Sequence, residues 1–133
     1  MRFINILGVT FLFFPTFLKY KSKRALSVFI NGVIFHSNEN NNFLRYYDII
    51  CNAIMCYYTY SKYPPALKYI LFSFFNFAMN SYLYENKYIS LVNSDFYHVF
   101  FVQSPLAVCL NKVSEFNDYS YKTSNILDSC NRI

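Results

Sequence analysis

The stretch NGVIFHS, at residues 31–37, is followed after a short polar turn by LRYYDIICN, at residues 44–52. It places His36 and Asp48 inside two consecutive apolar segments. Ionisable side chains inside a membrane are costly, so they are usually paired with one another or functional. The stretch therefore predicts two successive transmembrane helices that carry a polar cluster near one membrane face.

The composition of the whole chain favours an integral membrane protein. Its 133 residues are 55% hydrophobic and only 14% charged, whereas soluble domains carry about 25% charged residues. Aromatic residues reach 23%, all of them Phe and Tyr, and tyrosine is typical of membrane–water interfaces. The net charge of +5 comes from basic residues between apolar runs. That placement indicates orientation in a lipid bilayer and argues against a nucleic-acid partner.

Successive apolar runs predict an all-α fold, a polytopic transmembrane helical bundle with about five spans. The runs cover residues 3–18, 25–36, 43–60, 66–84 and 88–110. The second run is shorter than the roughly 20 residues that a span needs, so we expect its helix to begin near Lys19 or Lys21, whose long side chains reach the interface. Polar or proline-containing breaks separate later runs, at residues 37–42, 61–65 and 85–87. Residues 1–110 are thus the predicted transmembrane domain, and residues 111–133 a polar C-terminal tail.

A basic cluster at residues 19–24 follows the first apolar run. Because a cleaved signal peptide carries its charge before the apolar run, a retained anchor is favoured over a signal peptide. The positive-inside rule places the cluster on the cytoplasmic side. Five alternating spans then bring His36, Asp48 and His98 toward the opposite side of the membrane.

The two histidines of the chain, His36 and His98, both lie in apolar runs. Neutral imidazole is a good zinc ligand, and a carboxylate binds the metal or orients its water. We therefore predict a zinc site with His36 and His98 as ligands and Asp48 as the catalytic carboxylate. Asp95 is a further candidate ligand, because it lies three residues before His98 on the same helical face. The alternative is that each group lies at the lipid headgroups and bonds to water or a neighbouring helix.

Other polar residues of the apolar runs are predicted to form hydrogen bonds between helices. These residues are Asn52, Asn76, Asn80 and Gln103. The four cysteines form no CxxC pair, so their spacing supports neither a zinc finger nor a disulfide scaffold.

Three short motifs occur in a characteristic order: FHS at residues 35–37, LRYYD at residues 44–48 and FYHVFF at residues 96–101. This order resembles the CREST superfamily of membrane hydrolases, which includes alkaline ceramidases, progestin and adipoQ receptors and haemolysin-III-like proteins. In that family three histidines hold zinc, while an aspartate and a serine position the water that hydrolyses a lipid amide. The resemblance implies His36 as the first zinc ligand, Asp48 as the water-orienting carboxylate and His98 as one ligand of the last-helix pair.

The chain departs from the family pattern at several positions. Gly32 stands where the family has a serine, and the second histidine of the last helix falls on Ser94 or Val102. About five spans are predicted where the family has seven. The resemblance therefore implies a shortened relative that is inactive, or whose third ligand is Asp95 or water.

Three functions follow from these observations. The first is a zinc-dependent hydrolase of a lipid amide, and the second is a non-enzymatic membrane protein that packs on itself or on a partner as a homo- or hetero-oligomer. A transporter or channel subunit that uses Asp48 and Glu85 ranks last, because no span is expected to carry a recurring polar face. Soluble enzyme classes are disfavoured, since the chain has no Gly-rich phosphate loop, no GxSxG and no HExxH.

Overall fold

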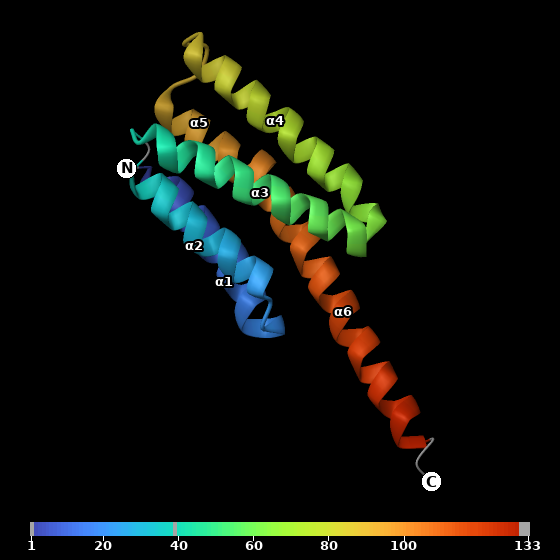
Figure 1. Ribbon diagram of the computed structural model, residues 1–133. Coiled ribbons are helices and arrows are strands. Elements are labelled where there is room, and N and C mark those ends of the chain that lie inside the picture. Colours follow the sequence, from blue (N-terminus) through green and yellow to red (C-terminus); the bar gives the residue numbers. More distant parts are fainter. Residues whose placement is uncertain (1, 39, 131–133) are drawn as a thin grey trace.

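The structure, a computed structural model, describes residues 2–38 and 40–130 (Figure 1). These two ranges are mostly helical and contain no strand. Its elements are α1 Phe3–Tyr20, α2 Lys23–Ser37, α3 Asn42–Lys62, η1 Pro64–Ala66, α4 Leu67–Glu85, α5 Leu91–Tyr97, η2 His98–Gln103 and α6 Ser104–Cys130. The all-α prediction is confirmed.

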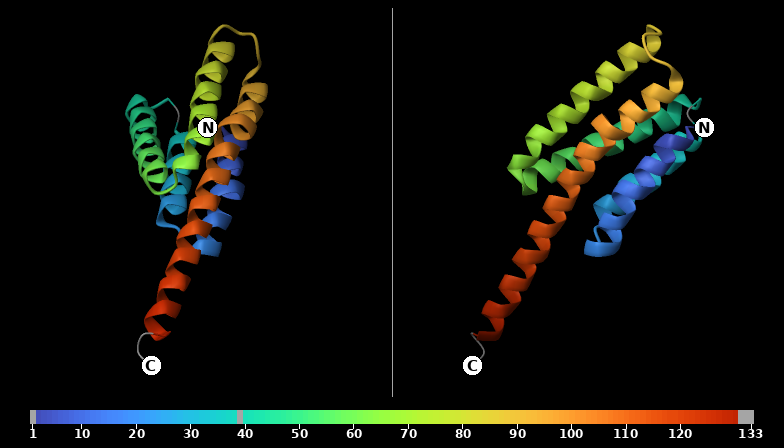
Figure 2. Two further views of the ribbon diagram at one scale, coloured as in Figure 1. Left: turned by 90° about the vertical axis from the view of Figure 1, so that its right-hand side faces the viewer. Right: turned by 180° about the vertical axis from the view of Figure 1, so that it is seen from behind.

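The described helices form five long rods that run back and forth. Elements α5, η2 and α6 follow one another without a break, so together they form the fifth rod. The η2 segment is a π-helical turn. The fifth rod packs against α1, α3 and α4, while α2 packs between α1 and α3 (Figures 1 and 2). The fifth rod is therefore central to the bundle.

The ends of the helices follow from local sequence signals. Side-chain oxygens of Ser22, Asn41 and Ser90 accept hydrogen bonds from the first backbone N–H groups of α2, α3 and α5, as good N-cap residues do. Pro64 and Pro65 open η1 immediately before α4, because proline fits the first turn of a helix but not its interior. Connections between helices lie at each of the predicted breaks, residues 37–42, 61–65 and 85–87, but with different bounds: 38–41, of which residue 39 lies outside the described part of the chain, then residue 63, and 86–90.

The fifth rod does not end where the polar tail was predicted to begin. Helix α6 continues through residue 110 to Cys130, and Val113 and Ser114 are still buried in the bundle. From Glu115 to Tyr121 the side chains are exposed, and this part of α6 extends beyond the other helices (Figure 2). The tail residues 131–133 lie outside the described part of the chain.

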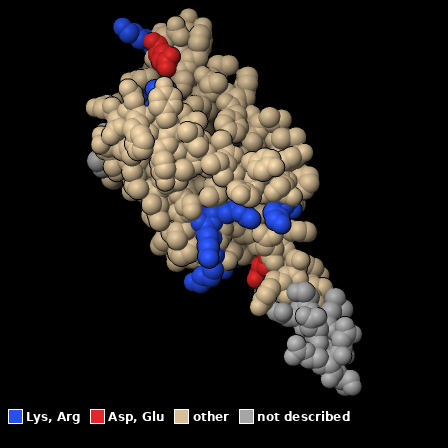
Figure 3. All heavy atoms as spheres, in the orientation of Figure 1, with Lys and Arg blue, Asp and Glu red and all other residues tan. Residues whose placement is uncertain are grey.

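Beside an apolar core that includes Val9 and Phe13, the bundle buries several polar side chains and exposes many large apolar ones. Asn5 is 0% exposed, whereas Phe11 and Phe75 are 72% and 64% exposed. Large exposed apolar surfaces mark contact with a membrane or a partner. Most of the visible surface is an uncharged band, with lysines and arginines gathered toward its ends (Figure 3).

The connections α1–α2 and α3–α4 lie at one end of the bundle, here called the basic end. It carries Lys19, Lys21, Lys23, Arg24, Lys62 and Lys68. The other end, here called the far end, carries the connections α2–α3 and α4–α5 and the start of α1. Among the described helices, α1 alone is both long and apolar enough to cross a membrane by length and composition, and it lies near the N-terminus.

Candidate functional site

A cavity of about 280 Å³ lies inside the bundle, toward the far end. His36 at the end of α2, Asp48 in the second turn of α3 and His98 at the start of η2 all line it. These three residues come from three different rods. The structure therefore brings the two predicted zinc ligands and the predicted catalytic carboxylate to one cavity.

The imidazole rings of His36 and His98 lie next to each other. Their centroids are 5.5 Å apart and the rings meet edge to face, while the ring of Phe77 lies 6.1 Å from His98. Two imidazoles on one tetrahedral zinc have centroids about 5 Å apart, given zinc–nitrogen bonds of about 2 Å. The spacing of the rings thus fits two ligands of one ion.

Asp48 lines the cavity with one oxygen hydrogen-bonded and the other without a described partner. Its Oδ2 accepts a hydrogen bond of 3.0 Å from Nδ2 of Asn52, one turn later on α3. Its Oδ1 is buried and has no hydrogen-bond partner among the residues that the structure describes. Buried acceptors of this kind normally bind water or a ligand. One carboxylate oxygen is therefore placed to accept a hydrogen bond from a molecule in the cavity.

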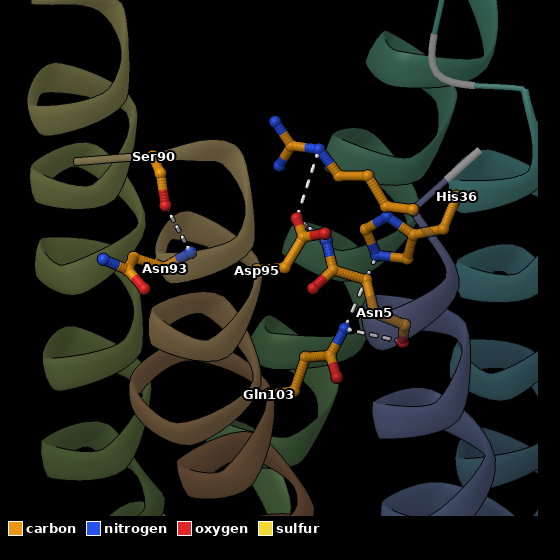
Figure 4. A network of polar contacts seen from close by, with 7 residues as sticks. Asn5, His36, Ser90, Asn93, Asp95 and Gln103 are labelled. Atoms are coloured by element: carbon orange, nitrogen blue, oxygen red, sulfur yellow. Dashed lines mark hydrogen bonds and ion pairs between the residues drawn. The ribbon is translucent and has the colours of Figure 1, made fainter. Parts of the chain in front are cut away.

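Asp95, the further candidate ligand, has different neighbours from those expected. Its Oδ1 lies 3.3 Å from Nε of Arg2 and accepts a hydrogen bond of 3.2 Å from Nδ2 of Asn5 (Figure 4). Asp95 is buried and does not line the cavity. The carboxylate balances the charge of Arg2 at the start of α1.

Gln103 connects α1 with His36. Its Nε2 donates a hydrogen bond of 3.3 Å to the carbonyl of Asn5 and lies 3.5 Å from Nε2 of His36 (Figure 4). Because a carbonyl only accepts, the amide nitrogen must face Asn5, and the nearby His36 nitrogen is then the acceptor. Gln103 thus favours the neutral tautomer of His36 that is protonated on Nδ1.

Two of the predicted interhelical hydrogen-bond partners are confirmed. Gln103 bonds to α1 as described, and Asn76 of α4 accepts a hydrogen bond of 2.6 Å from the hydroxyl of Tyr97. Asn52 bonds within its own helix. Asn80 is buried and lines the cavity, and its Oδ1 has no partner among the described residues.

Helix α3 carries a polar face that was not predicted from the sequence. Arg45, Asp48, Asn52 and Cys56 line the main cavity, and Thr59 follows three residues later. Steps of three and four residues place these side chains on one side of a helix. The expectation that no span carries a recurring polar face is therefore wrong. The spacing of these residues by three and four positions is the signal in the sequence that reveals the face.

The role of Arg2 was also missed. In the sequence it stands immediately before an apolar run, where basic residues commonly flank a membrane helix. In the structure its side chain pairs with Asp95 and lies over the ring of Tyr84, 5.2 Å from the centroid. No local signal connects a residue at position 2 with a partner in the fifth rod.

Within the described part of the chain, no group of three or more His, Cys, Asp and Glu side chains is arranged to hold a metal ion. The pair of imidazoles is thus accompanied by Asp48 at the same cavity, but by no third metal ligand among the described residues. Comparison of the chain with protein-family models, with curated proteins and with solved structures found no match.

Proposed function

We propose that the chain is a multi-pass membrane protein whose five rods each cross the bilayer. The buried polar side chains and the exposed large apolar ones support this arrangement, since helices in lipid bury small and polar groups and expose apolar ones. The distribution of charge supports it as well, because the basic end carries more lysine and arginine than the far end, where the described basic residues are Arg2, Arg45 and Lys87. By the positive-inside rule the basic end is cytoplasmic.

Labelling with a membrane-impermeant maleimide tests this topology. Single cysteines at Ser37 and Lys62, in a background without other cysteines, are expected to react from opposite sides of sealed vesicles. Reaction of both from the same side would overturn the five-span topology.

We further propose that the cavity is the active site of a zinc-dependent hydrolase of lipid amides. The observation that carries this proposal is the meeting of His36, Asp48 and His98, from three rods, at one cavity. The order of their motifs resembles the CREST hydrolases, which suggests the amide substrate.

In this proposal His36 and His98 would hold the zinc ion, which when bound supplies a Lewis acid for the amide carbonyl and acidifies water. Asp48 accepts a hydrogen bond from the attacking water through Oδ1, while Asn52 holds Oδ2 and so fixes the carboxylate. Zinc bound to Nε2 of His36 would take the place of the contact between that nitrogen and Gln103. Apolar residues such as Phe13, Phe74 and Leu106 line the same cavity and are suited to the acyl chain of a lipid.

Metal analysis of the purified protein tests the zinc site. We expect about one zinc per chain, lost in the His36→Ala/His98→Ala variant and retained in Tyr97→Phe. The second variant is a matched control, because Tyr97 adjoins His98 but does not line the cavity. Asp48→Asn should retain zinc and lose hydrolysis of a fluorescent N-acyl lipid. Absence of zinc from protein exposed to excess zinc and then desalted would remove the proposal.

The alternative is a non-enzymatic membrane protein that packs on a partner. Asp95 pairs with Arg2, and the described residues provide no third protein ligand for the two imidazoles. Both observations favour this alternative. Function would then survive alanine at His36, Asp48 and His98 and fail on substitution of exposed aromatic residues such as Phe75 and Phe100. The zinc-hydrolase proposal makes the opposite prediction for both sets of variants.

A further inference from the structure

A second, smaller cavity of about 20 Å³ adjoins the main cavity on the side of the basic end. Both cavities share Val28, Asn52, Cys56 and Leu106 in their walls. We propose that the two cavities form one internal water path, which runs along the polar face of α3 from Thr59 to Asp48. The path rests on the proposed function, since it would supply water, the second substrate of any hydrolysis, to a site enclosed by lipid.

The wall of this path is one side of α3. Asp48, Asn52, Cys56 and Thr59 follow one another at steps of four, four and three residues, so they form a stripe along the helix. The opposite side of α3 is apolar and exposed, and it consists of Ile50, Ile54, Tyr57 and Tyr58. α3 is thus amphipathic with its polar side turned inward, as expected for a helix that lines water.

Two buried polar atoms along the stripe need a hydrogen-bond partner that water can provide. Thr59 is only 2% exposed, yet its Oγ1 has no hydrogen-bond partner among the described residues, and the same is true of Oδ1 of Asp48. Nearly all buried polar groups in proteins bond to protein or to ordered water. Thr59 lines the small cavity and Asp48 the main one, so an unpartnered oxygen lies at each end of the stripe.

The volumes are sufficient for this role. A water molecule needs a cavity of roughly 10 to 15 Å³ on this measure, together with polar partners. The small cavity of about 20 Å³ has room for one, beside Thr59 and Asn52, and the main cavity of about 280 Å³ has room for several. Eleven residues separate Thr59 from Asp48, which corresponds to roughly 17 Å along a helix at about 1.5 Å per residue. Thr59 lies one turn from Lys62 at the basic end, so the path opens the cluster of His36, Asp48 and His98 toward the cytoplasmic side.

Hydroxyl-radical footprinting by X-ray radiolysis tests the path, because radicals formed from internal water oxidise the side chains next to it. Met55 lines the small cavity, whereas Met79 is similarly half-buried and lines neither cavity. In the full chain reconstituted in lipid, we expect Met55 to be oxidised at least fivefold faster than Met79. Both methionines lie in one molecule, so the comparison does not depend on the folding of a variant.

A second measurement uses Thr59. Thr59→Val keeps the shape of the side chain and removes the hydroxyl, so oxidation of Met55 should fall severalfold while oxidation of Met79 stays unchanged; Thr59→Ser should retain the original rate. Oxidation of Met55 no faster than that of Met79, or unaffected by Thr59→Val, would overturn the water path. Zinc content is measured independently of this oxidation rate. A protein that binds zinc but shows no fast oxidation of Met55 would overturn only the proposed water path. A protein that shows fast oxidation of Met55 but binds no zinc would overturn only the proposed hydrolase.

Discussion

Arg2 and Asp95 form an ion pair between the start of α1 and the fifth rod, with Nε of Arg2 3.3 Å from Oδ1 of Asp95. The backbone N–H of Arg2 also donates a hydrogen bond of 3.0 Å to the carbonyl of His36 at the end of α2. Asn5 adds a further hydrogen bond to the same carboxylate. The beginning of the chain thus holds three rods together beside the cavity.

Removal of one partner of this ion pair should destabilise the bundle strongly. Asp95→Leu leaves the largely buried Arg2 without the carboxylate that balances its charge, and breaking a buried pair in this way costs about 3 to 5 kcal/mol. The double variant Arg2→Met/Asp95→Leu should be more stable than Asp95→Leu alone, because no unbalanced charge remains. Unfolding in mixed detergent micelles measures both. Strictly additive effects of the two substitutions would contradict a direct pair.

Gly32 is expected to tolerate no side chain. A Cβ at this position of α2 would lie 2.7 Å from Cγ1 of Val9 and 3.3 Å from its Cβ, because α1 and α2 approach closely there. Gly32→Ala should lower the free energy of unfolding by about 1 to 3 kcal/mol, the usual range for overpacking. Adding Val9→Ala should recover part of this loss, since it removes the clashing methyl groups. A Gly32→Ala protein as stable as the original would show that the helices separate without cost.

Lys21 occupies a backbone conformation that suits glycine. It ends α1 with φ 52° and ψ 32°, in the left-handed region, which is unfavourable for residues with a Cβ. Lys21→Gly should therefore stabilise the protein by about 1 kcal/mol, as glycine does at this C-terminal position of helices. Lys19→Gly is the control, because it places glycine inside α1 and should lower stability. Melting temperatures in detergent distinguish the two outcomes.

Ser73 is predicted to hold α4 against the fifth rod. Its hydroxyl donates a buried hydrogen bond of 2.8 Å to the carbonyl of Val102 in the π-helical turn. Ser73→Ala removes this donor and should cost about 1 to 3 kcal/mol, the range for leaving a buried group unpaired. Ser81→Ala, also on α4 at the cavity, is the comparison and should change stability by less than about 0.5 kcal/mol. Equal losses for the two variants would argue against a specific role for Ser73.

Local signals in the sequence predicted the helical fold and most of the helix ends. Capping residues such as Ser22 and Asn41, and the Pro64–Pro65 pair, act on the backbone within a few residues, so their effect can be predicted locally. The alternation of the rods also followed from the sequence, and it placed His36, Asp48 and His98 toward one end. It did not predict that α6 continues to Cys130, since a polar composition is compatible with an exposed helix as well as with a tail.

Long-range packing of the helices determines which side chains are in contact. The contacts of Asp95 with Arg2 and of Gln103 with His36 depend on how each helix is rotated about its axis, and no local signal sets that rotation. The π-helical turn at His98–Gln103 is the clearest example, because it widens one turn of the fifth rod and changes the direction in which later side chains point. The candidate site residues could thus be predicted from the sequence, whereas long-range packing determines which of them line the same cavity.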